Sequence, residues 1–404
     1  MKIKEFLRRK ERNTTFLGIC PMTNEIVKAA ILEAKEVGFA PMFVATPRQV
    51  DADRGYTGWS QGDLVEFVED TSREIGYCGD YLIARDHGGP YQSFRDRGKP
   101  GVDKSKSMEF ARELFFEDLR AGFDIIHVDA TEDPRVEGKL GLKEIADRTV
   151  ELITDLEDFI SREGLTNVIY EIGTEEIVGG MTDPGNFEEF IKLVKGKLCD
   201  QEIEKKIIFV VGQVGTTMRI DMKNSFDETQ ASRLVEISSK SNLFLKVHYT
   251  DWLDDRTLER FPEIGIGAAN VGPEFATALI GALLELEEKE KRALSDSKKE
   301  GNYSNFFQTL QKATIEVAPW RKFIPDEVDG KEPTEFSRQN RKNITLCVGR
   351  YALSETEVRS ARSRLYDNLN RFTDIEDIEG YLVDRIREKI RRYGEAFDLG
   401  AQNS

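Results

Sequence analysis

The chain has 404 residues, of which 39% are hydrophobic and 33% charged, as in a globular protein with a large core. Its net charge of -16 opposes binding to nucleic acid or anionic membranes, and no run of 18 apolar residues could span a bilayer. Four separated cysteines without a CxxC pair, and an amino-terminal stretch without a signal-peptide core, predict a cytoplasmic protein. We therefore expect neither nucleic acid nor membrane as a partner.

Eight short runs of apolar and β-branched residues recur along the first two thirds of the chain. Near-continuous hydrophobicity of this kind is typical of parallel strands that are covered on both faces. In chain order the runs are Thr15–Met22, Phe39–Thr46, Tyr81–Gly88, Asp124–Thr131, Asn167–Glu175, Lys206–Gly215, Leu243–Asp251 and Ile264–Pro273.

Amphipathic stretches separate these runs. In Asn24–Val37 and Met108–Ala121, for example, apolar residues recur at spacings of three and four, which predicts helices with one buried face. Eight alternating strands and helices predict an α/β fold, a closed (β/α)₈ TIM barrel. A doubly wound open sheet is the alternative.

The pattern changes after the eighth run. Phe275–Ala293 predicts a long helix that ends in charged residues, and Tyr351–Phe372 and Ile378–Phe397 predict further helices. Alternating charges in the last of these indicate a solvated helix face. We expect residues 1–285 to form the barrel and residues 286–404 a helical extension packed on it.

Polar residues gather at the ends of the predicted strands, where barrel enzymes carry their catalytic groups. All three histidines of the chain, His87, His127 and His248, fall at such ends. Acids, amides and a glycine join them there, namely Asp86, Asp129, Glu171, Glu175, Gln213, Asp251, Asn270 and Gly272.

Imidazole and carboxylate groups together suit a divalent metal, Zn²⁺ first, with Mn²⁺, Co²⁺ or Fe²⁺ as alternatives. A ligand set drawn from His87, Asp129, Glu175 and His248 would leave one coordination position open. Two adjacent oxygens of a ketose could occupy that position, and the metal would polarise the carbonyl.

Several of these residues also allow a structural interpretation. Asp86 and Asp251 could each cap a helix, and His127 could be a core histidine with satisfied hydrogen bonds. Glu171 could pair with a neighbouring lysine. These alternatives stay open on the sequence alone.

Two segments could bind a phosphate group. Gly272 precedes a predicted helix, whose first amides could face an anion, and residues 215–219 follow the sixth strand. Either segment could instead be a simple turn.

Motifs along almost the whole chain resemble those of one family, the tagatose-bisphosphate aldolase class II accessory subunits. These are the so-called non-catalytic Z subunits, and the wider family includes ketose 4-epimerases. The segments that carry the resemblance are 45–50 with 55–58, 86–90, 121–123 with 126–129, 146–148, 172–175 with 179–180, 248–251 and 271–273, continued by 276–279. The tail resembles the family only loosely, at positions 360, 362, 364 and 366.

The resemblance implies a barrel related to class II aldolases, with roles for the strand-end residues. Asp86 would transfer a proton, and His87 and His248 would be metal ligands. Glu175 and Asp129 would complete or support the site, with Glu175 as a second catalytic candidate. The predicted substrate-binding residues are Gln49, Glu171, Gln213, Asp251, Asn270 and Gly272.

The main functional hypothesis is a metal-dependent enzyme that acts on a ketose or ketose phosphate by aldol or enediolate chemistry, as an aldolase or a 4-epimerase. The alternative is a non-catalytic subunit that stabilises a class II aldolase, and a third possibility is an isomerase that moves a carbonyl between C1 and C2. The expected partners are a small sugar or sugar phosphate, an aldolase catalytic subunit, and further copies of the chain in a homo-oligomer.

Overall fold

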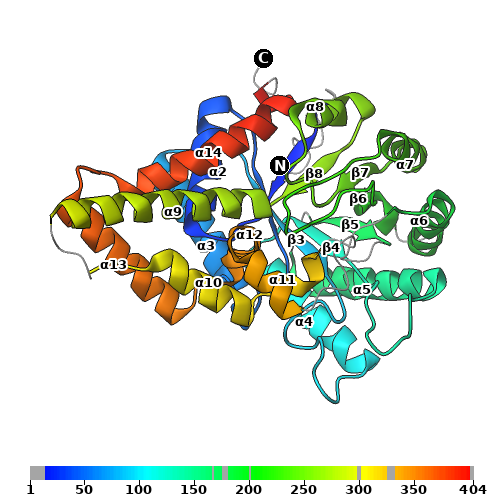
Figure 1. Cartoon of the computed structure of the whole chain (residues 1–404). Coiled ribbons are helices and arrows are strands. Elements are labelled where there is room, and N and C mark those ends of the chain that lie inside the picture. Colours follow the sequence, from blue (N-terminus) through cyan, green and yellow to red (C-terminus); the bar gives the residue numbers. More distant parts are fainter. Residues whose placement is uncertain are drawn as a thin grey trace.

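A computed structural model describes residues 14–165, 168–174, 181–199, 202–297, 302–324 and 333–400. Eight parallel strands pair in chain order, and the eighth returns to the first, which confirms the predicted closed (β/α)₈ barrel (Figure 1). Each predicted run contains one strand. The strands are β1 Phe16–Ile19, β2 Met42–Ala45, β3 Leu82–Gly88, β4 Ile125–Val128, β5 Ile169–Gly173, β6 Ile207–Val211, β7 Phe244–Val247 and β8 Ala268–Val271.

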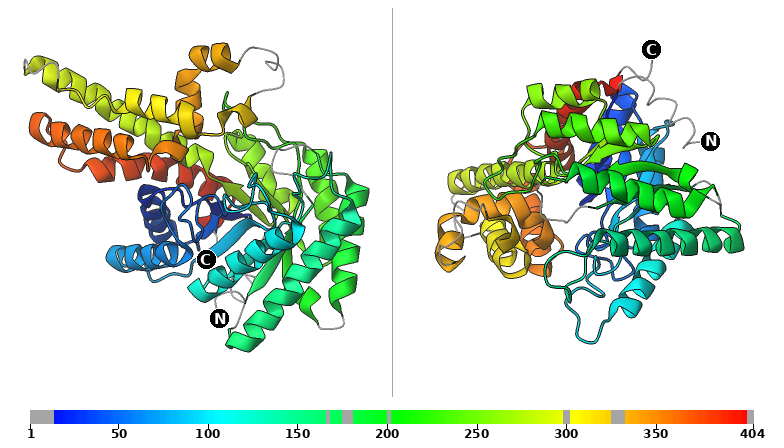
Figure 2. Two further views of the ribbon diagram at one scale, coloured as in Figure 1. Left: turned by 90° about the horizontal axis from the view of Figure 1, so that it is seen from below. Right: turned by 90° about the vertical axis from the view of Figure 1, so that its right-hand side faces the viewer.

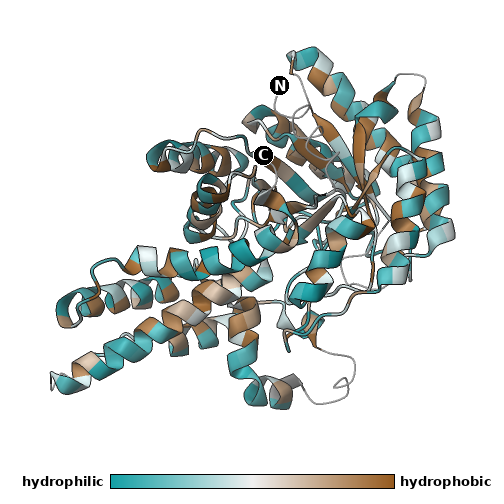
Figure 3. Ribbon diagram, turned by 90° about the horizontal axis from the view of Figure 1, so that it is seen from above, coloured by the Kyte–Doolittle hydropathy of each residue, from teal (hydrophilic) through white to brown (hydrophobic). Residues whose placement is uncertain are grey.

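Helices surround the strands and turn their apolar faces toward them, while hydrophilic residues dominate the outer faces (Figure 3). This is the reason why the parallel strands are hydrophobic on both sides. The helices of the barrel are α2 Asn24–Val37, α3 Gln61–Ile75, α4 Lys104–Ala121, α5 Leu142–Glu163, α6 Pro184–Leu198, α7 Glu228–Lys240 and α8 Asp255–Ile264, with a short 3₁₀ helix η3 Ile203–Lys206.

Helix α2 illustrates how the sequence sets these elements. The side chain of Thr23 accepts a hydrogen bond from the backbone N–H of Ile26 at the first turn. Gly38 ends the helix with a φ of 88°, a left-handed conformation that glycine adopts at little cost. Between these caps, Ile26 and Ala30 lie on the face that packs against the strands.

The carboxyl-terminal part of the chain forms a layer of helices beside the barrel, and α14 returns to pack against α2 (Figure 2). Its elements are α9 Pro273–Asp296, α10 Phe306–Val317, η4 Trp320–Phe323, α11 Pro333–Gln339, α12 Arg341–Val348, η6 Gly349–Ala352, α13 Thr356–Phe372 and α14 Ile378–Ala396. Helix α9 runs without interruption through residue 285, so the boundary expected there stays a prediction. Among the described residues, no helix combines the length and the apolar character that a membrane crossing requires.

The interior of the barrel has an apolar half and a polar half. Side chains in a strand return to the same face every second residue. The apolar half contains Phe16, Met42, Val44, Leu82, Ala84, Ile125, Ile169, Phe209 and Ala268. Two residues further along their strands, the same inner face carries Asp86, His127, Glu171 and Asn270. The packed apolar layer therefore forms the floor beneath a polar group at the strand ends.

A buried ion pair anchors strand β3 on its outer side. Arg85 precedes Asp86, and its Nε donates to Oδ2 of Asp118 on α4 over 2.8 Å. Nη1 of the same guanidinium donates to the backbone carbonyls of Ala45 and Val50 at 2.9 and 2.8 Å. Both charged side chains are fully buried. Arg85 thus joins β3, α4 and the segment after β2.

Removing the carboxylate of Asp118 should destabilise the fold strongly, because the buried guanidinium of Arg85 would lose its counter-charge. We expect Asp118→Ala to lower the free energy of unfolding by about 3–5 kcal/mol, as measured by urea denaturation. The matched control is Asp70→Ala, which breaks an exposed pair with Arg73 and should cost less than about 1 kcal/mol. Equal losses in the two variants would contradict the anchoring role.

Candidate active site

A β-bulge in β3 brings two consecutive side chains to the mouth of the barrel. The register between β3 and β4 shifts between Arg85 and Gly88, and His87 has a φ of 47°. A regular strand would point Asp86 inward and His87 outward, but the bulge redirects the second side chain. Both residues line the same cavity. Backbone strain of this kind is concentrated at functional sites.

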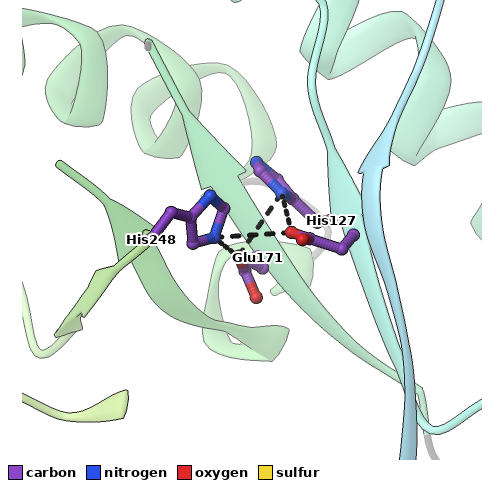
Figure 4. Close-up of side chains that lie close together, drawn as sticks. His127, Glu171 and His248 are labelled. Atoms are coloured by element: carbon purple, nitrogen blue, oxygen red, sulfur yellow. Dashed lines mark hydrogen bonds and ion pairs between the residues drawn. The ribbon is translucent and has the colours of Figure 1, made fainter. Parts of the chain in front are cut away.

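Four buried side chains, three on strands β3, β4 and β5 and one directly after β7, converge next to this bulge, namely Asp86, His127, Glu171 and His248. Nδ1 of His127 lies 3.3 Å from Oδ1 of Asp86 and 3.4 Å from Oε1 of Glu171. Nε2 of His248 lies 3.4 Å from each of the same two oxygens. Figure 4 shows the imidazoles of His127 and His248 directed at the carboxylate of Glu171. We call these four side chains the His/acid cluster.

The spacing of the donor atoms in the His/acid cluster suits a metal ion. Ligand atoms about 2.1 Å from a tetrahedral ion lie about 3.4 Å from one another. The four nitrogen–oxygen separations given above, 3.3 to 3.4 Å, match that value. All four donor atoms lie within 4.8 Å of one another, so one ion could contact each of them. Nδ1 of His127 accepts a hydrogen bond from the backbone N–H of His87 over 3.1 Å, and it would have to give up this bond to bind the ion. The cluster therefore fits a divalent metal by residue type and by spacing.

The charges of the cluster also favour a cation. Nζ of Lys246 lies 2.6 Å from Oε2 of Glu171, and both side chains are fully buried. Burial opposes the ionisation of Glu171, but the charges of Lys246 and His127 outweigh it and lower the pKa of Glu171 to about 2. Burial likewise opposes ionisation of Asp86, yet His248 and His87 lower its pKa well below the usual value. When the imidazoles are neutral, two carboxylates and one ammonium leave a surplus negative charge, which protonation of an imidazole or a metal ion can offset.

A chain of hydrogen bonds orients the ring of His248. Oδ2 of Asp129 lies 2.7 Å from Nδ1 of His87, and Nε2 of His87 lies 3.0 Å from Nδ1 of His248. With His87 neutral, its Nδ1–H donates to the carboxylate, and its Nε2 accepts from His248. The nitrogen of His248 that faces the His/acid cluster is then the one without a hydrogen, the form in which imidazole binds metals.

Asp129 is held by other contacts on both oxygens. Nε2 of Gln92 donates to Oδ2 over 2.9 Å, and the hydroxyl of Thr131 donates to Oδ1 over 2.5 Å. The backbone of Gly89 lies against the backbone of Asp129. Only glycine fits there, because a Cβ at this position would lie 1.8 Å from the carbonyl oxygen of Asp129. The structure thus gives Asp129 a position from which it orients His87, whereas its predicted role as a metal ligand stays a prediction.

A cavity that opens to solvent lies above the His/acid cluster. Its lining includes seven predicted residues, namely Gln49, Asp86, His87, His248, Asp251, Asn270 and Gly272. It also includes side chains that the sequence did not suggest, such as Arg48, Tyr56, Gln92, Phe323, Arg350 and Tyr351. The last three belong to the helical extension, which therefore forms part of the wall.

The remaining predicted residues lie elsewhere. Glu171 lies in the His/acid cluster beneath the cavity, and the expected alternative of a lysine partner is confirmed by its contact with Lys246. Gln213 is half-buried, and its backbone forms hydrogen bonds with Thr182. It is not among the residues that line the cavity. Glu175 lies outside the described residues. The roles of Gln213 and Glu175 stay predictions.

Asp251 caps helix α9, as its structural interpretation proposed. Its Oδ1 accepts hydrogen bonds from the backbone N–H groups of Gly272 and Glu274, at 3.0 and 2.7 Å. Burial raises the pKa of Asp251 to about 7, although these two hydrogen bonds oppose the shift. The amide of Gly272, which we considered for phosphate binding, is therefore already engaged by a side chain of the protein.

Fold and site together define the class of the protein, a (β/α)₈ barrel with a buried group of imidazoles and carboxylates that could hold a metal ion. Residues 3–392 match the family described as D-tagatose-1,6-bisphosphate aldolase subunit GatZ/KbaZ-like, and the chain belongs to this family. The family resemblance inferred from the motifs is thereby confirmed.

Individual relatives differ in their names. The chain is 28% identical over 297 residues to a D-tagatose 6-phosphate 4-epimerase of Agrobacterium fabrum, which covers 69% of this chain and 68% of that protein. It is 23% identical over 394 residues to the D-tagatose-1,6-bisphosphate aldolase subunit GatZ of Salmonella paratyphi B, which covers 92% and 88%.

A crystal structure of a probable tagatose 6 phosphate kinase from Sinorhizobium meliloti superposes with a TM-score of 0.77 at 19% identity, over 95% of this chain and 100% of that one. A fructose-bisphosphate aldolase from Campylobacter jejuni gives a TM-score of 0.51 at 12% identity, over 92% and 93%. At these identities the likeness concerns the fold alone.

The raised pKa of Asp251 predicts a pH-dependent stability that a substitution should remove. Since the folded-state pKa of about 7 exceeds the usual 3.8, the folded state holds the proton more tightly. The resulting stabilisation is complete below about pH 4 and is lost as the pH rises through about 7. Asp251→Asn keeps an acceptor for the two amides without titrating. We expect its free energy of unfolding, relative to the unmodified protein, to rise between about pH 4 and about pH 8.

The control for this experiment is Asp70→Asn, which changes an exposed carboxylate. Its stability difference should stay nearly constant over the same pH range. A constant difference for Asp251→Asn as well would mean that the amides of α9 keep this carboxylate ionised in the folded protein.

Proposed function

We propose that the protein is a metal-dependent enzyme that acts on a ketose phosphate, with epimerisation at C4 as its reaction and aldol cleavage as the related alternative. The observation that carries this proposal is the His/acid cluster, where four side chains of the types that bind metals lie together, two of them, Asp86 and His248, in the lining of a cavity. Membership of the GatZ/KbaZ-like family and the likeness to a D-tagatose 6-phosphate 4-epimerase support the choice of substrate class.

The metal would be held by His127, Glu171 and His248, three ligands of the kind that leave a coordination position open. A divalent cation in this position supplies Lewis-acid chemistry, because it polarises a carbonyl group. This set shares only His248 with the set expected from the sequence. His87 then acts through hydrogen bonds, since its ring lies between Asp129 and His248.

Asp86 would be the proton-transfer group. It belongs to the His/acid cluster and also lines the cavity, so a substrate hydroxyl can reach its carboxylate. Nδ2 of Asn270 donates to Oδ2 of Asp86 over 3.2 Å and holds the carboxylate in place. A carboxylate of low pKa accepts a proton from a hydroxyl only when the negative charge left on the substrate is stabilised. That requirement agrees with the placement of Asp86 beside the proposed cation.

Aldol cleavage and epimerisation can share this machinery. Removal of the proton from a hydroxyl at C4 allows the C3–C4 bond to break, and the electron pair of that bond passes to the carbonyl at C2. If the aldehyde fragment turns over before the bond forms again, the configuration at C4 is inverted. If it leaves, the result is cleavage. The cavity, rather than the cluster, would decide between the two outcomes by holding or releasing the fragment.

A second candidate function is that of a non-catalytic subunit of a class II aldolase. It is supported by the likeness to GatZ subunits, which extends over 92% of the chain. A purely stabilising subunit has no need for buried carboxylates and imidazoles under an open cavity, because such groups lower stability unless they are compensated. The two functions differ in whether the isolated chain turns over substrate.

Turnover by the isolated chain tests the proposal. Purified protein supplied with Zn²⁺, Mn²⁺ or Co²⁺ should convert D-tagatose 6-phosphate to its C4 epimer, D-fructose 6-phosphate, as followed by ¹³C NMR. Asp86→Asn should lower kcat by about 10²–10⁴-fold, because proton transfer is lost. Asp70→Asn, an exposed carboxylate, should leave kcat unchanged. Absence of turnover, together with activation of an aldolase partner, would favour the subunit function.

Metal content separates the two ligand sets without any assay of activity. We expect close to one equivalent of metal by mass spectrometry of the purified protein, and its loss in His248→Ala and Glu171→Gln. His87→Ala should weaken binding by only about 10–100-fold, as removal of an orienting partner does. Circular dichroism would verify that each variant is folded. Full metal content in Glu171→Gln with complete loss in His87→Ala would instead favour the set with His87, Asp129 and Glu175.

A further inference from the structure

Two arginines line the cavity without a counter-charge. Arg48 lies in the loop after β2, and Arg350 lies in η6 of the helical extension. Neither guanidinium group has a carboxylate within 4.0 Å in the described ranges of the chain. In a protein whose net charge is -16, unpaired cations at the wall of a cavity indicate a site for an anion.

Arg350 is buried, and the groups that contact its guanidinium are uncharged. Only 5% of the residue is exposed. Nη1 donates to the backbone carbonyl of Cys347, Nη2 lies 3.5 Å from Sδ of Met218, and the centre of the Tyr351 ring lies 4.7 Å from the guanidinium carbon. A thioether sulfur is a weak acceptor, and none of these groups carries a negative charge. A buried charge without a counter-charge lowers stability, and an anion in the cavity would supply one.

Arg48 has a donor atom without an acceptor. The side chain is half-buried, and its Nη2 atom is buried without a hydrogen-bond partner in the described part of the chain. Buried donors of this kind are rare in folded proteins, because the loss of their hydrogen bonds to water is not repaid. An oxygen of a bound anion would satisfy this donor.

Backbone and ring contacts hold the two arginines on one side of the cavity. The backbone carbonyl of Arg48 accepts a hydrogen bond from the N–H of Tyr56 over 2.9 Å. The ring of Tyr56 lies against that of Tyr351, the neighbour of Arg350, with 4.5 Å between the ring centroids. The hydroxyl of Ser354 donates to the backbone carbonyl of Tyr56 over 2.8 Å. The extension therefore packs on the loop that carries Arg48.

The acids that line the cavity have partners other than these arginines. Among the described lining residues, the carboxylates are those of Asp86 and Asp251. Asp86 faces the imidazoles of the His/acid cluster, and Asp251 accepts hydrogen bonds from the amides at the start of α9. Barrels often bind phosphate after their last strands, where α9 begins, but here Asp251 engages those amides. The arginine side of the cavity is therefore the better place for an anion.

We propose that Arg48 and Arg350 bind the phosphoryl group of the substrate. This inference rests on the proposed function for the identity of the substrate, a ketose phosphate, whereas the anion site depends only on the contacts of the two arginines. The carbon skeleton would extend from this side of the cavity toward Asp86, which lines the same cavity. Since Arg350 belongs to the helical extension, the extension takes part in substrate recognition.

Isothermal titration of the full-length protein with inorganic phosphate tests the site without any turnover. Phosphate should bind to the unmodified protein, and Arg48→Met and Arg350→Met should each weaken its affinity about tenfold or more, because each removes a charge-assisted hydrogen bond. Arg359→Met is the matched control, since it removes an exposed arginine of the extension that does not line the cavity. Its affinity should equal that of the unmodified protein. Absence of phosphate binding, or unchanged affinity in either Arg48→Met or Arg350→Met, would overturn the inference.

Thermal unfolding distinguishes a ligand-binding arginine from a structural one. Phosphate should raise the Tm of the unmodified protein and of Arg359→Met, but not that of Arg350→Met. Without phosphate, Arg350→Met should be at least as stable as the unmodified protein, because it removes a buried charge that has no counter-charge. Arg350→Lys, which keeps the charge, should fold and bind phosphate more weakly, because lysine lacks the paired donors of a guanidinium group. A destabilised Arg350→Met whose Tm still rises with phosphate would show a structural role alone.

A second titration compares D-tagatose 6-phosphate with D-tagatose. Only the phosphorylated sugar should lose affinity in Arg48→Met and Arg350→Met. Glu171→Gln, which should lose its metal, should still bind inorganic phosphate, whereas loss of phosphate binding in this variant would place the anion on the metal ion and overturn the inference. Phosphate binding that depends on both arginines, in a protein that turns over no ketose phosphate, would uphold the anion site and reject the proposed function.

Discussion

Two buried carboxylates, Asp86 and Glu171, face one buried ammonium group, that of Lys246, inside a closed barrel. The other groups in the polar half of the interior surround this excess of negative over positive charge. His127 lies on β4, between the strands of the two carboxylates, and His248 follows β7. Both imidazoles approach the carboxylates at distances that suit a shared cation. The apolar layer below keeps water out, so the electrostatic interactions among these groups are strong. Buried carboxylates of this kind need a positive counter-charge, so binding of a cation would stabilise the folded protein.

The fold could be predicted from the sequence because its strands and its helices each follow a hydrophobic pattern that short segments reveal. Near-continuous apolar runs marked all eight strands, and a pattern of three and four marked helices such as α2, whose bounds agree with the expected 24–37. The predicted helix from residue 351 is the instructive exception. The chain first forms a 3₁₀ turn, η6, and α13 begins at Thr356, because hydrophobic spacing does not distinguish a 3₁₀ turn from the first turn of an α-helix.

The site could be predicted only in part. Asp86, His87, His127 and His248 could be predicted from their position at strand ends, because the carboxyl ends of parallel strands meet at one face of a barrel. The division of roles among them depends on a bulge and on a positive φ at His87, which no local pattern reveals. Lys246 stands in an apolar run, in phase with His248, and this phase was the signal that could have found it. Side chains from the extension reach the cavity through long-range packing, which the sequence does not encode locally.

Helix α9 begins beside the cavity and continues into the extension as a single rod of 24 residues, about 36 Å long. A rod leaves no flexible joint between the two parts, so the extension cannot swing aside like a hinged lid. Exchange of small molecules must then rely on shorter movements of loops and side chains at the entrance. Deletion of the extension would therefore expose the side of the barrel that it covers, including the face of α2 against which α14 packs.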